Sequence, residues 1–424
     1  MQHLLKSLKQ LRIYETEHFA VCYKPEGLQI EKTKKDSLGL IDVVSWTISQ
    51  KLWPTLSLAD KLSGFVIFAK NKNFDMKLVE NLLIETNLKF EIKSSLNFDS
   101  KFLSHNLELS HLFQTAWQSL NLLFYIKNDH CYRLIHSSNL DIQADIYGEI
   151  LWVYWYKTDM PTEQEKNIIF EFAKSIHKKS CIRHMVNRGY GVGGQESEKL
   201  FTSPDMPLEW IAFENGLQFK LKQNSGFSPG LFLDQSENRF YILNHSKNKK
   251  ILNLFSYTSG FSVAAAAGCA QEICSVDASS SFLEWSKDNF ILNNIDLNNQ
   301  KICKTEFYNQ DTLLFLAGAK KRKRKWDLII CDPPSFGRTK TTIWKIEKDL
   351  PLLAKEIWDC LTLNGEILFT CNYEKWNLAE VIKNFTLKLK ANQFEIESLP
   401  YPSLDIGLPG ENSLTKGFIL RKIN

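Results

Sequence analysis

Short apolar runs alternate with helix-forming segments in the C-terminal part of the chain. Residues 251–255 form an apolar run with the length of a strand that is buried on both faces. The alanine-rich residues 261–270 predict a helix, and residues 272–276 predict a second strand that ends at Asp277. These elements form one β-α-β unit with a carboxylate at the tip of its second strand.

The same alternation continues toward the C-terminus. An amphipathic helix with a serine N-cap is predicted over residues 279–294, a third strand over 302–307, and a helix that begins at Asp311. A buried strand ends at Asp332, and a helix over 347–361 leads to strands before Cys371, at 394–399 and at 417–421. Residues 240–424 are therefore predicted to form a Rossmann-like α/β domain with a sheet of about seven strands.

The chain before residue 240 has a different character. Residues 163–179 have helical periodicity, and residues 213–222 predict a β-hairpin with its turn at Asn215 and Gly216. Residues 74–130 carry little information. We expect a smaller α+β linker domain over residues 131–239, preceded by a separate N-terminal segment over residues 1–130.

Composition restricts the classes of function. A chain of 424 residues usually folds as two or three domains. The net charge of +4 does not by itself indicate a nucleic-acid partner. Nine cysteines without a C-x-x-C pair indicate free thiols in a reducing compartment and no metal site. No apolar run suits a signal peptide or a membrane span, so we expect a cytoplasmic protein without membrane contact.

The turn that follows the first strand of the β-α-β unit holds a single glycine, Gly260. A dinucleotide pyrophosphate needs a turn with several glycines, so a nicotinamide-linked oxidoreductase on the same fold is disfavoured. S-adenosylmethionine (SAM) has no phosphates and fits this turn better. Asp277 would then accept hydrogen bonds from the ribose hydroxyls; the alternative is an ordinary crossover with an incidental acid.

The segment W-D-L-I-I-C-D-P-P-S-F-G-R, residues 326–338, is the most specific signal in the chain. Its prolines fix an extended turn at the carboxyl end of a strand, where parallel α/β sheets bind their ligands. A D-P-P-x-[FY] turn after such a β-α-β unit resembles that of class I SAM-dependent methyltransferases that act on nucleic acid. The resemblance implies that Asp332, Pro333, Pro334 and Phe336 present the base.

Residues 225–239, S-G-F-S-P-G-L-F-L-D-Q-S-E-N-R, are similar to T-G-x-F-L-D-Q-R-x-N-R, although Ser236 replaces the first arginine. With residues 133–154, this motif makes residues 132–424 resemble the large-subunit ribosomal RNA methyltransferases of the cytosine-C5 and guanine-N7 type. The resemblance implies SAM-dependent methylation of large-subunit rRNA. The residues expected at the cofactor are Asp234, Arg239, Phe255, Ser256, Tyr257, Gly260, Asp277, Ala278, Asp311 and Asp332.

Cys371 follows the predicted strand E-I-L-F-T and is expected near the D-P-P-S-F turn. In this family the members that methylate cytosine C5 have a cysteine here, which adds to C6 of the ring and makes C5 nucleophilic. Members that methylate a guanine nitrogen lack it. Cys371 is either this nucleophile or a small apolar strand residue, and the sequence favours cytosine C5 by a narrow margin.

Two N-terminal segments, residues 13–28 and residues 57–71, resemble the pseudouridine synthases that use an R-L-D motif. Ala59 stands at the position of that family's catalytic aspartate, and Asp60 lies one position late. We therefore predict a truncated segment that makes no pseudouridine and that serves either in RNA contact or as structural padding.

Two basic stretches are candidate RNA contacts. Arg183, His184 and Arg188 form one, and the six residues 320–325, K-K-R-K-R-K, form the other. Each is otherwise a solvated part of the surface. A non-catalytic RNA-binding protein derived from decayed enzymes is the alternative of another class, and the intact D-P-P-S-F turn and Asp277 argue against it.

Overall fold

The computed structural model describes residues 13–15, 19–24, 40–47, 50–54, 64–72, 109–114, 116–117, 120, 127–135, 141–185, 199–226, 228–297, 303–338, 343–400 and 415–423. The chain divides into two compact units. Unit 1 comprises residues 1–184, 199–204 and 401–411, and unit 2 comprises residues 185–198, 205–400 and 412–424. Among the residues described, no helix is long and apolar enough to cross a bilayer.

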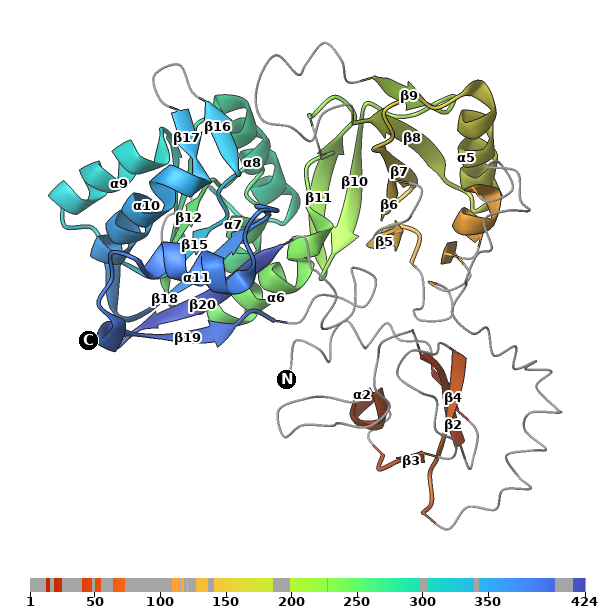
Figure 1. Cartoon of the computed structure of the whole chain (residues 1–424), viewed down its shortest axis with the longest axis horizontal. Coiled ribbons are helices and arrows are strands. Elements are labelled where there is room, and N and C mark those ends of the chain that lie inside the picture. The colour runs from red at the N-terminus through yellow and green to blue at the C-terminus, as the bar shows by residue number, and fades with distance from the viewer. Residues whose placement is uncertain are drawn as a thin grey trace. The chain divides into compact units, whose positions relative to one another are not determined.

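The described residues of unit 1 form two sheets (Figure 1). The first has the order β1-β2-β4-β3, with β1 Ile13–Glu15, β2 Phe19–Lys24, β4 Gly64–Ala69 and β3 Trp53–Pro54, and it is accompanied by helix α2, Leu40–Thr47. The second has the order β5-β6-β7-β8-β9, with β5 Cys131–Ile135, β6 Ile142–Tyr147, β7 Ile150–Trp155, β8 Lys179–His184 and β9 Leu200–Thr202. Helix α5, Glu163–Ser175, connects the parallel strands β7 and β8 and begins with a capping box between Thr162 and Glu165.

The two segments that resemble pseudouridine synthases contribute neighbouring strands. Strand β2 pairs antiparallel with β4 along its whole length, from Phe19 opposite Ala69 to Lys24 opposite Gly64. Ala59 and Asp60 lie outside the described residues. The loss of uridine isomerisation therefore stays a prediction.

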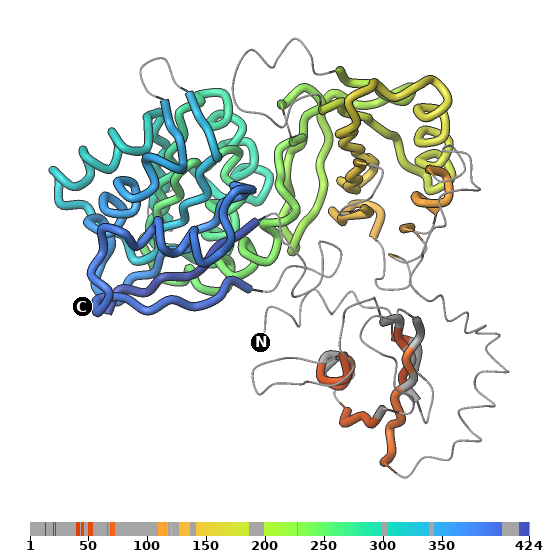
Figure 2. Tube along the Cα trace, viewed as in Figure 1, coloured from red at the N-terminus to blue at the C-terminus, as the bar shows by residue number. Residues whose placement is uncertain are grey.

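Unit 2 is built on a seven-stranded sheet, as the sequence predicted, with the order β14-β13-β12-β15-β18-β20-β19. The strands are β12 Lys250–Leu254, β13 Glu272–Asp277, β14 Lys304–Asn309, β15 Trp326–Cys331, β18 Leu361–Cys371, β19 Phe394–Ser398 and β20 Lys416–Lys422. The last strand in sequence, β20, lies between β18 and β19 and runs antiparallel to both. Figure 2 traces the chain to its C-terminal end in blue. The strand order reverses between β12 and β15, and such a switch point places a ligand crevice at their carboxyl ends.

Helices cover both faces of this sheet (Figure 1). One layer consists of α6 Ser236–His245, α7 Gly260–Ala267 and α8 Ser280–Leu292, and the other of α9 Thr312–Lys321, α10 Ile346–Cys360 and α11 Leu378–Thr386. The second layer packs Phe315, Leu353 and Phe385 against Leu254, Ile329 and Phe369 of the sheet. Two short strands, β16 Phe336–Arg338 and β17 Ile343–Lys345, form a hairpin directly after the D-P-P turn.

The β-hairpin expected in the linker domain lies in unit 2. Its strands are β10 Glu209–Glu214 and β11 Leu217–Lys222, and both turn residues, Asn215 and Gly216, have the positive φ of a type I′ turn. Asn289 and Asn293 of α8 accept hydrogen bonds from the backbone N–H groups of Lys220 and Gln218, each at 2.9 Å. Because α8 satisfies the free edge of β11, the hairpin packs with the sheet of unit 2, and this division does not coincide with the predicted boundary at residue 239.

Candidate cofactor and active site

The loop after β12 has an unusual backbone. Phe255, Tyr257 and Ser259 have φ values of 56°, 51° and 61°, a left-handed conformation that costs about 1–3 kcal/mol for each non-glycine residue. Several hydrogen bonds hold the loop in place. Ser256 N donates to the Val276 carbonyl at 3.0 Å, Tyr257 N donates to the Asp277 carboxylate at 2.8 Å, and Thr258 Oγ1 donates to the Gly230 carbonyl at 2.6 Å. Its shape is therefore fixed by its surroundings.

Asp277 lies at the end of β13, next to this loop. One of its carboxylate oxygens accepts from Tyr257 N at 2.8 Å and the other from Ser279 N at 2.9 Å. Burial raises the pKa of the Asp277 carboxyl above its usual value, and the bonds from these backbone groups oppose that rise. A carboxylate has about four acceptor positions, so acceptor capacity remains for the hydroxyl groups of a ligand. Ala278 is exposed beside it.

Buried oxygens near the same loop lack hydrogen-bond partners. Within the described residues, Ser256 Oγ, Ser259 Oγ and Asn238 Oδ1 are such atoms. A buried polar atom left without a partner costs about 1–3 kcal/mol, so these positions are suited to a polar ligand. The methionine amino group of SAM and its ribose hydroxyls are groups of this kind, and the residues present therefore fit the cofactor. Among the described residues, no cluster of His, Cys, Asp and Glu could hold a metal ion.

Arg239 has a structural task that the sequence did not indicate. Its guanidinium donates to both oxygens of Glu214, at 2.7 and 2.6 Å, and to the carbonyl of Phe232 at 2.8 Å. Both partners of this ion pair are buried. Gly260 lies against the same side chain, since a Cβ at Gly260 would come within 3.2 Å of Arg239 Cδ. Arg239 of α6 thus joins hairpin β10–β11 to the segment that precedes α6. It does so next to Gly260, which follows the loop after β12.

Two other acids expected at the cofactor have partners within the protein. The Asp234 carboxylate accepts a hydrogen bond from Thr415 Oγ1. Asp311 is the N-cap of α9, and its Oδ1 accepts from Leu313 N at 3.0 Å and from Leu314 N at 3.2 Å. The prediction that a helix begins at Asp311 is confirmed, and its contact with the cofactor stays a prediction.

The D-P-P-S-F turn lies at the end of β15. It is next to the loop after β12, residues 255–259, on the other side of the switch point. Trp344 of β17 donates from Nε1 to the Pro334 carbonyl at 2.7 Å, and its ring centroid lies 5.7 Å from that of Phe255. Trp344 therefore links the two loops, although the sequence analysis did not identify it. Pro333 is buried, whereas Phe336 is partly exposed in β16.

Asp332 is the polar centre of this turn. Thr370 Oγ1 donates to its Oδ1 at 2.7 Å, and Gln235 Nε2 donates to its Oδ2 at 3.2 Å. Burial raises the pKa of the Asp332 carboxyl to about 7, against the lowering effects of the Thr370 hydrogen bond and of the Arg239 charge. An acid that titrates near neutrality in a ligand crevice is typical of an active site.

Cys371 does not share this position. Successive strand side chains point to opposite faces, so Thr370 and Cys371 of β18 face different sides of the sheet. Thr370 contacts Asp332, whereas Cys371 is fully buried in the core beneath α10 and α11. Burial raises the pKa of the Cys371 thiol to about 12, and the nearby Asp332 carboxylate adds to the rise. The pKa of the Cys331 thiol is also raised, mainly by burial.

The two basic stretches predicted to contact RNA differ in their surroundings. Arg183 and His184 are buried in β8, so the prediction that they form an exposed phosphate-binding surface is wrong, and Arg188 lies outside the described residues. Residues 320–325 precede β15 and lie at the amino edge of the sheet, opposite the crevice. There Lys320 pairs with Glu356 and Asp359.

Arg324, within the same run, donates to Glu272 at 2.7 Å and also pairs with Glu306. The alternative of a solvated surface stretch does not hold for Arg324, which is partly buried over the ring of Trp326.

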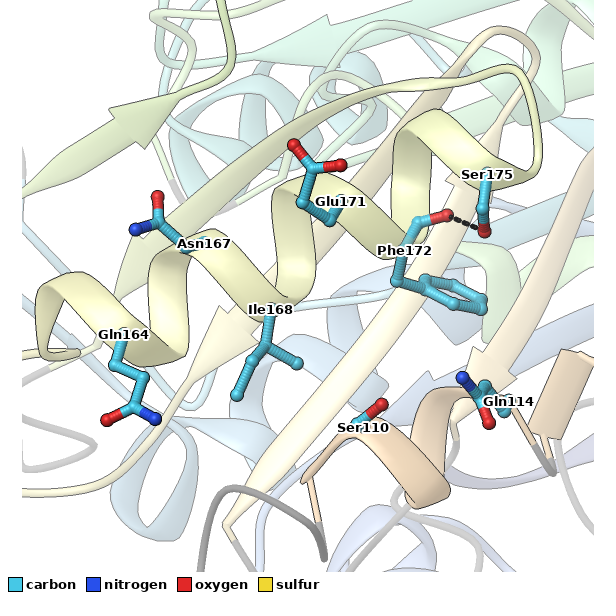
Figure 3. Close-up of a pocket in the computed structure, with 8 residues that line it drawn as sticks. All are labelled: Ser110, Gln114, Gln164, Asn167, Ile168, Glu171, Phe172 and Ser175. Carbon is cyan, nitrogen blue, oxygen red and sulfur yellow. Dashed lines mark hydrogen bonds between the residues drawn. The ribbon is translucent and has the colours of Figure 1, made fainter.

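Unit 1 has a groove of its own (Figure 3). It lies between α5 and the helical residues 109–114, and its polar lining includes Ser110, Gln114, Asn167 and Glu171. None of the residues predicted at the cofactor or the base belongs to it. We therefore assign the candidate site to the carboxyl edge of the sheet in unit 2.

The strand order reverses at this edge of the sheet, and the loop after β12 and the D-P-P turn meet there. Together these features define a class I methyltransferase. The chain belongs to the S-adenosylmethionine-dependent methyltransferase family, which matches residues 138–394. SAM is accordingly its cofactor. In the fold, the chain is similar to SMU.776 solved in complex with SAH, with a TM-score of 0.65, 24% identity and coverage of 76% of this chain and 83% of that one. The SAM-dependent methyltransferase from Agrobacterium tumefaciens gives a TM-score of 0.51 at 19% identity, over 70% of this chain and 91% of that one.

Among curated relatives, the chain is similar to proteins named ribosomal RNA large subunit methyltransferase K/L. The protein of Pseudoalteromonas atlantica is 31% identical over 264 residues, which are 60% of this chain and 36% of that protein. The protein of Colwellia psychrerythraea is 28% identical over 330 residues, or 75% of this chain and 44% of that protein. The chain thus spans less than half the length of these relatives.

Proposed function

We propose that this enzyme methylates a guanine nitrogen of large-subunit ribosomal RNA. The observation that carries the proposal is the meeting of the D-P-P-S-F turn and the Asp277 loop at one sheet edge, where Thr370 donates a hydrogen bond to Asp332. The names of the curated relatives support rRNA as the substrate. A cytosine-C5 activity, which the sequence favoured narrowly, is the second candidate.

The residues at this edge divide between cofactor and base. When bound, SAM supplies an activated methyl group on its sulfonium. Asp277 would bind the ribose hydroxyls with its remaining acceptor positions, and Ser256 and Ser259 would bind polar groups of the methionine moiety. Asp332 would accept a hydrogen bond from an N–H group of the base, and Phe336 would stack on its face. Positioning of this kind is the main contribution that the protein makes, because the methyl donor is already activated.

The environment of Cys371 supports nitrogen over cytosine C5. Cysteine addition to C6 needs a thiolate, and a thiol with a pKa of about 12 is ionised in only about one molecule in 10⁵ at pH 7. A guanine nitrogen attacks the methyl group with its own lone pair and needs no protein nucleophile. The buried Cys371 accordingly fits the alternative that the sequence left open, a small apolar residue of the strand.

Basic side chains at the crevice support an RNA substrate. Arg338 of β16 and Lys345 of β17 are exposed on the hairpin that follows the D-P-P turn. Cations beside a partly exposed aromatic such as Phe336 suit an unpaired nucleotide, whose base stacks while its phosphates are neutralised. We propose this hairpin as the RNA contact of unit 2, in place of the run at residues 320–325.

The test is methylation of rRNA taken from cells that lack the gene. Purified protein and SAM carrying a labelled methyl group are incubated with this RNA, and the labelled nucleosides are identified by mass spectrometry. Methylguanosine would support the proposal, and 5-methylcytidine would replace it with the second candidate. If the protein binds SAM but the rRNA stays unlabelled, the proposal of an rRNA substrate is contradicted. An Asp332→Ala variant that retains SAM binding provides the inactive control.

A further inference from the structure

We infer that Gln235 and Thr370 are positioning residues that clamp the Asp332 carboxylate and hold its free acceptor positions toward the base. The inference rests on the proposed role of Asp332 in contacting the base. It concerns residues that cannot reach the substrate themselves, because Gln235 is 4% exposed and Thr370 is 0% exposed.

The hydrogen bonds give each group a defined direction. Thr370 Oγ1 has one proton, which it donates to Asp332 Oδ1 at 2.7 Å, and the same oxygen accepts from Gln235 Nε2 at 3.2 Å. The other proton of Gln235 Nε2 is directed to Asp332 Oδ2, also at 3.2 Å. Asn238 Nδ2 donates to Gln235 Oε1 at 2.8 Å and thereby fixes which end of the Gln235 amide faces Asp332.

This arrangement orients the carboxylate from two sides. Gln235 belongs to the 3-10 turn η1, Leu233–Gln235, and Thr370 belongs to β18, so the two donors come from elements far apart in sequence. Each carboxylate oxygen keeps a second acceptor position that the clamp does not use. Two donors also stabilise the ionised form of the acid, which is the form that accepts a hydrogen bond from a base N–H.

The clamp also sets the pH range in which Asp332 is ionised. The charged or titratable groups that act on Asp332, or on which it acts, are Asp234, Arg239 and the thiols of Cys331 and Cys371. The Thr370 bond lowers the pKa of Asp332, so its removal should raise the pKa above about 7. At a pKa of about 7 about one half of the Asp332 carboxyl groups are ionised at pH 7, and a higher pKa would lower that fraction.

The decisive variants are Thr370→Val, which keeps the shape and removes the hydroxyl, and Thr370→Ser, which restores the hydroxyl. Thr362→Val is the matched control, because Thr362 lies at the opposite end of the same strand. Its hydroxyl is within hydrogen-bond distance of the Trp326 carbonyl, at 3.2 Å, and of the Asp327 carboxylate, at 3.1 Å. With rRNA and saturating SAM, Thr370→Val should lower kcat about fivefold at pH 7 and regain most of it at pH 9. Thr370→Ser and Thr362→Val should keep the wild-type pH profile.

A second measurement needs no RNA. The titration of the Asp332 carboxyl is followed by NMR in protein with ¹³C-labelled aspartate, and its signal is assigned by its absence in Asp332→Asn. The titration should move to higher pH in Thr370→Val and in Gln235→Glu, and it should stay in place in Thr362→Val. An unchanged titration in both clamp variants would overturn the inference, as would a wild-type kcat and pH profile in Thr370→Val. If wild-type protein methylates no rRNA while the titration moves as expected, the proposed function fails and the clamp stands.

Discussion

At the scale of single residues, the strand pattern of β18 has the largest consequence for the chemistry. The sequence T-C-N invites attention to the cysteine, yet the preceding threonine faces Asp332 and the cysteine faces the helix layer. A shift of one position along a strand exchanges the two faces of the sheet. Assigning chemistry to a strand residue therefore depends on knowing which face the site occupies.

Substitution of Cys371 tests this assignment. Cys371→Ala should keep methyl transfer within about threefold of wild type, because no step needs the thiol. The loss of one buried heavy atom should cost about 1 kcal/mol of unfolding free energy, which urea denaturation would measure. A folded Cys371→Ala protein that binds SAM but loses transfer more than about a hundredfold would restore the thiolate mechanism.

Asp332 should make folding stability depend on pH. Its pKa is raised to about 7 in the folded protein from an ordinary value of 3.8, so the folded state binds the proton more tightly than the unfolded state. The stabilisation from this group is then fully present below pH 4 and is lost as the pH rises through about 7. The melting temperature of Asp332→Asn relative to wild type should therefore increase between pH 4 and pH 8.

A matched pH series would contradict this expectation if the difference in melting temperature between Asp332→Asn and wild type stayed constant. An amide does not titrate, so any cost of its altered hydrogen bonds with Thr370 and Gln235 is the same at every pH. Only the part of the difference that changes with pH reports on the buried carboxylate.

At the scale of secondary-structure elements, the location of a basic segment matters more than its charge. The run at residues 320–325 precedes a strand and so lies at the amino edge of a parallel sheet, where Glu272, Glu306, Glu356 and Asp359 pair with it. Hairpin β16–β17 carries fewer cations, but it follows a strand and adjoins the crevice. The direction of a strand thus decides which of its flanking loops reaches the substrate.

Salt dependence of RNA binding can separate these two surfaces. Arg338→Ala with Lys345→Ala should reduce the slope of log K against log salt by about 1.4, since each neutralised phosphate of a single strand contributes about 0.7. Lys321→Ala with Arg322→Ala removes the same two kinds of charge from the opposite edge and should leave the slope unchanged. Filter binding over a range of salt concentrations would measure both. An unchanged slope in the hairpin variant would exclude this hairpin as the RNA contact.

At the scale of the whole molecule, all residues assigned to the cofactor and the base belong to unit 2. This unit has its own core, in which Leu252, Ile329 and Ile367 of the sheet pack with Leu350 and Ile357 of α10. The hairpin β10–β11 belongs to it through the buried pair of Glu214 and Arg239.

A fragment of residues 205–424 should therefore fold and bind SAM with the affinity of the full chain. Calorimetry on both proteins makes the comparison, and Asp277→Ala in the fragment is the control. This variant should weaken binding by about 1.5–3 kcal/mol, the range for a hydrogen bond to a charged group. A folded fragment without affinity for SAM would show that the site needs residues before 205.

The sequence by itself determined the elements of unit 2 and the identity of its cofactor. Apolar runs of strand length, the single-glycine turn and Asp277 at a strand end are local patterns, and local patterns fix which segments become strands and helices. The seven-stranded sheet, the Ser279 and Asp311 caps and the turn at Asn215 and Gly216 follow from such patterns and are all present.

Only the tertiary structure decided which side chains meet. Gln235, Asp332 and Thr370 are separated by 97 and 38 residues in the chain, and no periodicity relates them. Arg239 pairs with Glu214, which lies 25 residues earlier in the chain, because the hairpin that carries Glu214 packs beside it. Cys371 is buried because β18 is a central strand with helices on both faces. Burial and partner choice depend on packing between distant segments, and this packing turns Asp332 into the titrating centre of the site and Cys371 into part of the core.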